Sequence, residues 1–99
     1  MPMVFLEVIL DAQDLEAHGL LSRDEIEDPL AAVLEASGLG EVTGGGGGTG
    51  RYVVDVEVSE PRFDEALATI RAALLDAGAP SSTIIRRHHP REESFRLVK

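Results

Sequence analysis

The chain has 99 residues, the length of one domain, and its 43% hydrophobic and 27% charged content is typical of a globular protein rather than a disordered one. Its 18 acidic and 9 basic residues give a net charge of −9, which repels phosphate backbones and argues against a nucleic-acid partner. Because the sequence has no cysteine, no bilayer-length apolar run and no signal-peptide pattern, we expect one cytoplasmic domain over residues 1–99, without disulfides or a membrane partner.

The first predicted element is a strand over residues 3–10, which are almost continuously apolar and rich in Val, Ile and Phe. Alternation along a strand sends successive side chains to opposite faces of the sheet. One face would carry Val4, Leu6, Val8 and Leu10, and the other Phe5, Glu7 and Ile9. Such an apolar strand is expected at the centre of its sheet.

Residues 11–21 have no clear period and are predicted to form a loop, with a short helical turn as the alternative. A helix is predicted between Ser22 and Gly38, because apolar residues recur there at helical spacing and Ser22 precedes Glu25 at the spacing of a capping box. Pro29 leaves the first residue of this helix undecided, because a proline inside a helix removes a backbone hydrogen bond. The alternative start places Asp28 at the N-cap and Pro29 at the first helical position.

A short strand signal over residues 41–43 runs into a pentaglycine, and we expect residues 44–50 to be a hairpin loop that a shorter turn could replace. Residues 52–58 then alternate, with Val53, Asp55 and Glu57 facing away from the core. Pro61 opens a second helix that Gly78 ends, and residues 82–88 read as a last strand. Residues 89–99 are basic and form either an edge strand over 94–98 or a tail.

The order of these elements predicts an α+β domain of the ferredoxin-like β-α-β-β-α-β type. Its four-stranded antiparallel sheet would place the first and third strands at the centre and both helices on one face, and the C-terminal segment would supply any additional edge strand. This architecture leaves one face of the sheet open, and fold alone does not determine function.

The glycine segment has two interpretations. It formally contains G-x-G-x-x-G at Gly45, Gly47 and Gly50, but a dinucleotide site requires a following helix, whereas here a strand follows. It is therefore either a flexible hairpin connection or a loop whose amides and Arg51 clasp an anion. The residues of this second interpretation are Gly44, Gly45, Gly46, Gly47, Gly48, Thr49, Gly50 and Arg51.

The remaining chemistry-bearing residues favour no catalytic or metal site. His88 and His89 would point to opposite faces of a strand and cannot share a metal ion. The helix dipole accounts for the acidic cluster at residues 24–28. Glu7, Asp55 and Glu57 would share one sheet face, but no nucleophile pattern accompanies them. We therefore expect neither an enzyme nor a cofactor.

The charge distribution suggests a function. Residues 1–60 hold thirteen of the acidic residues and two basic ones, which predicts a protein-interaction module of a regulatory, inhibitory or immunity-like kind that docks a basic partner. Grouped apolar residues on an open sheet face favour a covered surface, in a homodimer or by that partner. The predicted contact residues are Phe5, Glu7, Ile9, Val53, Asp55 and Glu57. The alternative is a dimeric regulatory domain whose glycine loop closes on an anionic small molecule.

Overall fold

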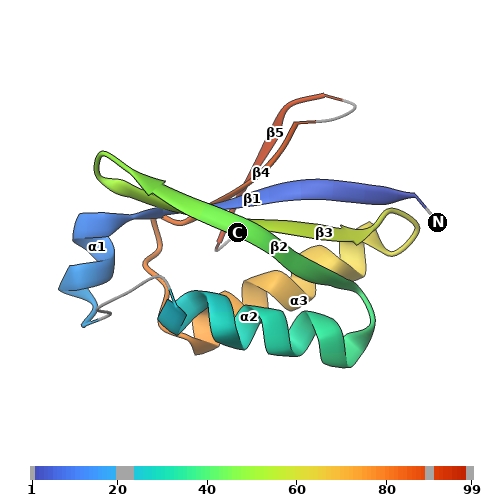
Figure 1. Cartoon of the computed structure of the whole chain (residues 1–99), viewed down its shortest axis with the longest axis horizontal. Coiled ribbons are helices and arrows are strands. Elements are labelled where there is room, and N and C mark those ends of the chain that lie inside the picture. Colours follow the sequence, from blue (N-terminus) through green and yellow to red (C-terminus); the bar gives the residue numbers. More distant parts are fainter. Residues whose placement is uncertain (1, 20–23, 89–90, 98–99) are drawn as a thin grey trace.

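The computed structural model describes residues 2–19, 24–88 and 91–97. It is an α+β fold in which a five-stranded antiparallel sheet has two long helices on one face (Figure 1). The strands are β1 (Met3–Asp11), β2 (Gly40–Gly48), β3 (Arg51–Ser59), β4 (Ile84–Arg87) and β5 (Glu93–Arg96). The helices are α1 (Ala12–Ala17), α2 (Asp24–Ser37) and α3 (Phe63–Asp76).

The strand order is β2-β3-β1-β4-β5, so the first and third strands pair at the centre of the sheet, as predicted. β1 supplies Leu6, Val8 and Leu10 to the core, all fully buried. The alternating residues of β3 and the apolar stripes of α2 and α3 pack onto them. These core residues are Val54, Val56, Val58, Ile26, Leu30, Leu34, Ala66, Leu67, Ile70 and Leu74.

Two helical details differ from the sequence-based expectation. Residues 12–17 form α1 rather than a loop, because the Asp11 carboxylate accepts a hydrogen bond from the Asp14 amide at 3.0 Å and Leu15 is buried. Pro29 lies inside α2, so the alternative start at Asp28 is wrong. The predicted capping box involves Ser22, which lies outside the described residues. Gly38 follows α2 with φ of +68°, the left-handed conformation that glycine commonly adopts at the end of a helix, so the predicted end of this helix is confirmed.

The largest correction concerns the glycines. Gly44–Gly48 belong to β2 and pair with Arg51–Asp55 of β3, so the predicted hairpin loop is wrong. The connection is the turn at Thr49 and Gly50, where Gly50 has φ of +76°. Glycine weakens a strand but can still make its backbone hydrogen bonds, and pairing with the regular β3 ladder holds the segment extended. Shortening this segment would therefore remove paired residues.

The C-terminal part also differs in its boundaries. β4 is limited to Ile84–Arg87, because Thr83 is buried in a turn where its amide and hydroxyl both donate to the Pro80 carbonyl. Residues 93–96 pair with β4 as a fifth strand, so the C-terminal segment is an edge strand, as one of the two alternatives predicted, and not a tail. The described parts contain three helices instead of the expected two. Each helix in the described parts of the chain is too short or too polar to span a bilayer.

Candidate functional site

The six predicted contact residues lie together on one face of the sheet. α2 and α3 cover the other face (Figure 1). The β1–β3 register makes them three directly opposed pairs: Phe5 with Glu57, Glu7 with Asp55, and Ile9 with Val53. Their neighbours in sequence, such as Leu6 and Val54, face the core and are fully buried. Alternation along two adjacent strands therefore assembles this surface, which we call the open face.

β4 pairs with the other edge of β1 and lengthens two of these pairs into rows of three side chains. Ile9 pairs with Ile84 on the side opposite Val53, so three half-buried aliphatic side chains form one apolar row. Glu7 pairs with Arg86 on the side opposite Asp55, which forms a charged row beside it. Both rows run perpendicular to the strands. Neither Ile84 nor Arg86 is among the predicted contact residues, because the register of β4 cannot be read from its own segment.

His88 also belongs to this surface, which the sequence interpretation missed. Its Nε2 contacts Glu7 Oε1, and its ring stacks on Phe5 with 6.5 Å between ring centroids. Its partner in the predicted histidine pair, His89, lies outside the described residues. Two-residue alternation from Arg86 would have placed His88 on the same face as Arg86, but its position beside Phe5 follows from the pairing of β4 with β1.

The open face is electrically divided. Its β2–β3 flank carries Glu41, Asp55 and Glu57. Its β4–β5 flank carries the guanidinium groups of Arg86 and Arg96, and Arg86 Nε lies 3.8 Å from Glu92 Oε1, a long and exposed ion pair that offsets only part of the positive charge. Arg51 lies at the turn end of β3, opposite Asp11 of β1. The flanks are therefore acidic and basic, with β1 between them.

The excess negative charge of the chain lies mainly on the helices and not on the open face. The three helices hold ten of the eighteen acidic residues and one basic residue, Arg71. Arg62 donates two hydrogen bonds to Glu65, of 3.1 and 2.7 Å, and this bonding lowers the pKa of the Glu65 carboxyl and raises that of the Arg62 guanidinium. This exposed pair begins α3 and is not part of the open face.

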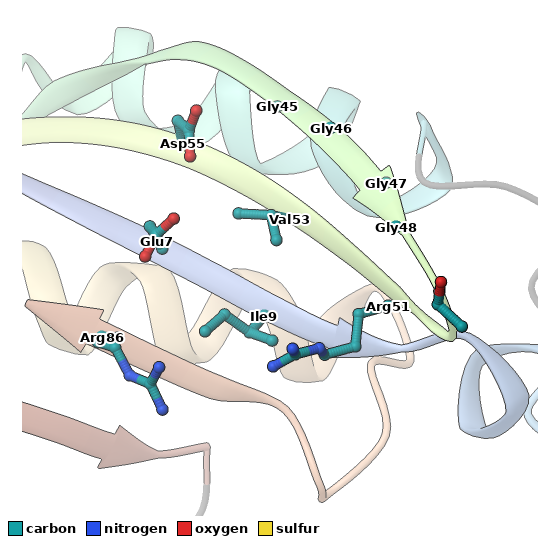
Figure 2. Close-up of a pocket in the computed structure, with 11 residues that line it drawn as sticks. Glu7, Ile9, Gly45, Gly46, Gly47, Gly48, Arg51, Val53, Asp55 and Arg86 are labelled. Atoms are coloured by element: carbon teal, nitrogen blue, oxygen red, sulfur yellow. The ribbon is translucent and has the colours of Figure 1, made fainter.

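A shallow hollow of about 700 Å³ lies on the open face beside the glycines (Figure 2). Ile9 and Val53 stand on its floor, and Glu7, Asp55, Arg51 and Arg86 surround them. β2 contributes only backbone along one side, because Gly44, Gly46 and Gly48 occupy its outward positions. A methyl group added at Gly46 or Gly48 would meet no atom within 4 Å. The hollow exists because these positions have no side chains.

The glycine segment brings Arg51 into this hollow but does not form the predicted loop. Its residues run as a paired strand, and the Arg51 side chain reaches across the end of β1 towards Ile9 (Figure 2). Within the described residues, no group of three or more His, Asp or Glu side chains is placed to hold a metal ion. Comparison of the chain with protein-family models, curated proteins and solved structures gave no match.

Proposed function

We propose that this protein is a cytosolic, non-enzymatic protein-interaction module that docks its partner through the open face. The observation that carries the proposal is the set of three cross-strand pairs, Phe5–Glu57, Glu7–Asp55 and Ile9–Val53, on a face that neither α2 nor α3 covers. Grouped apolar side chains on a sheet surface are typical of a contact surface.

The chemistry of the rows suits protein docking. Val53, Ile9 and Ile84 supply an apolar centre, and charged side chains on both sides supply the polar rim that interfaces usually have. Opposed charges mainly set the rate and orientation of association, while the apolar centre supplies most of the contact energy. The partner segment over the β2–β3 flank should therefore be basic, to meet Asp55 and Glu57.

The scaffold supports this use of the face. We infer that β1, α2, β2, β3, α3 and β4 form a ferredoxin-like unit to which β5 is added, and the strand order β2-β3-β1-β4 supports this assignment. In that arrangement both long helices cover one face, so the other is available for binding. Glu7 is engaged by His88 and opposes Asp55 and Arg86, an arrangement suited to a contact surface rather than to a reaction centre.

The hollow favours one alternative, a small anionic ligand. Arg51 and Arg86 both border it, and guanidinium groups bind carboxylates and phosphates well. Against this, Glu7 and Asp55 border the same space and would repel an anion. Arg51→Gln separates the two functions, because it should abolish anion binding and leave docking at Asp55 and Glu57 nearly unchanged.

The deciding experiment compares two variants with equal charge change. Asp55→Asn with Glu57→Gln neutralises the acidic flank, whereas Asp24→Asn with Asp28→Asn neutralises two exposed acids of α2. Immobilised wild type and both variants are exposed to cell extract at about 50 mM and about 500 mM salt, and the association rate of each retained protein is then measured after purification.

We expect the open-face variant to slow association about tenfold or more at low salt and the α2 variant to leave it within about twofold. Equal effects of the two variants would refute docking through the open face. Salt-independent association would refute charge steering.

A further inference from the structure

We infer that the partner of the open face is a second copy of this chain, bound face to face about a two-fold axis that runs parallel to the strands over β1. This inference rests on the proposed function, since it identifies the partner of that docking surface. It is carried by the way charge and apolar rows are distributed across β3, β1 and β4.

The two flanks of the open face have complementary charge. Asp55 and Glu57 lie on β3, one strand to one side of β1, and Arg86 lies on β4, one strand to the other side. A surface that is acidic on one side and basic on the other becomes complementary to itself when a copy is turned over. Identical surfaces that meet about a two-fold axis form a closed dimer.

The register selects the direction of that axis. Asp55 and Arg86 both oppose Glu7, so they lie in one row on either side of β1. An axis parallel to the strands places Asp55 over the partner's Arg86, and symmetry makes this contact twice. An in-plane axis perpendicular to the strands would instead place each acidic flank over the other, where like charges repel.

The same axis matches the apolar row. It places Ile9 over the partner's Ile9 and Val53 over the partner's Ile84, so three half-buried side chains of each copy meet in the centre. Stacked sheets pack in this aligned way about 10 Å apart, with a relative rotation of about 30°. This axis also places Glu7 opposite the Glu7 of the second copy, and each of these carboxylates is contacted by Nε2 of the His88 of its own chain, which reduces the repulsion between them when the imidazole is protonated.

The overall charge does not oppose this association strongly. The helices carry most of the excess acid, and in this dimer they lie on the two outer surfaces, facing away from the contact. A stable dimer buries about 800 Å² on each chain, which is about a seventh of the 5639 Å² of accessible surface.

The test uses two single charge reversals, Asp55→Arg and Arg86→Asp, in the full chain. Each alone places like charges together at both symmetric contacts, so sedimentation equilibrium should show a dissociation constant raised about thirtyfold or more. Mixed in equal amounts, the two variants should form a heterodimer, because Arg at position 55 of one meets Asp at position 86 of the other. Glu35→Arg makes the same charge change as Asp55→Arg at an exposed site of α2, and its dimer should have the dissociation constant of the wild type.

Circular dichroism and thermal melting of each variant establish that it is folded before its assembly is interpreted. A wild type that stays monomeric at about 500 μM, or single variants that do not combine on mixing, would overturn the inference. If the wild type is monomeric and yet a purified foreign partner loses affinity with Asp55→Asn and Glu57→Gln, self-association fails while the proposed function stands. If neither association depends on the open face, both fail.

Discussion

β1 presents alternate side chains to two different environments. On its helix side, Leu6 and Val8 are fully buried in a core that includes Leu30 of α2 and Ile70 of α3. On its other side, Phe5 is 37% exposed and Ile9 is half-buried. On the helix side, burial in the core selects apolar residue types, and this selection is visible in the alternation of a single strand. On the open face, the neighbours of each side chain depend on how the strands pair, so they can be predicted only from several strands together.

The largest expected effect distinguishes these two faces within one strand. Leu6→Ala should lower the free energy of unfolding by about 2–5 kcal/mol, because it leaves a cavity in a fully buried site. Ile9→Ala should lower it by about 1 kcal/mol, because the side chain is half-buried. Urea titrations followed by circular dichroism at low protein concentration measure both. Equal losses would show that the open face contributes to the fold as much as the core does.

Glycines of β2 extend the comparison to the edge of the sheet. A Cβ at Gly40 would lie 2.1 Å from the Glu57 carbonyl oxygen and 2.9 Å from Val58 Cα, so Gly40→Ala should destabilise the fold by about 1–3 kcal/mol. A Cβ at Gly46 meets nothing within 4 Å, so Gly46→Ala should stabilise it by about 0.5–1 kcal/mol through reduced chain entropy. Thermal melts of the two variants should shift in opposite directions, and a destabilised Gly46→Ala would contradict the open space beside that residue.

The elements that the sequence predicted well are those with a strong local pattern. Alternation over residues 52–58 and the apolar run over residues 3–10 predicted both central strands and the face on which Glu7 and Asp55 lie. α1 was not predicted because its six residues are too few to show a helical period, and the N-cap at Asp11 alone is a weak indication of a helix. The glycine part of β2 was not predicted as a strand because glycine has no side chain to show alternation. Pairing with β3 holds this segment in the extended conformation instead.

The incomplete prediction of the open face has a similar cause. Arg86 and His88 become neighbours of Glu7 and Phe5 only through the pairing of β1 with β4, two strands that are far apart in sequence. The local pattern groups His88 with the basic C-terminal segment and indicates no contact with the first strand. Register between distant strands depends on the turns and packing of everything between them, so a single segment does not reveal it.

Two adjacent arginines of β4 allow the faces to be compared with one residue type. Arg87 lies on the helix side, where its guanidinium is 4.7 Å from the centroid of the Phe63 ring and pairs with Glu93. Arg87→Ala should therefore cost about 1 kcal/mol of fold stability. Arg86→Ala, on the open face, should change it by less than about 0.5 kcal/mol. Denaturant titrations that rank the two in the reverse order would contradict this division.

The smallest expected effect concerns the helix side itself, at the exposed Arg62–Glu65 pair. Arg62 lowers the pKa of the Glu65 carboxyl below its unfolded value of about 4.3, so this pair stabilises the fold above that pH and the contribution is lost as pH falls through the folded pKa. The Arg62 guanidinium stays charged throughout this range. Glu65→Gln should therefore reduce stability slightly at pH 6 and leave it unchanged at pH 2, with Asp64→Asn as the neighbouring control. Because both side chains are exposed, added salt at about 1 M should remove most of the difference. An effect that persists at pH 2 would assign the role of Glu65 to packing rather than to its charge.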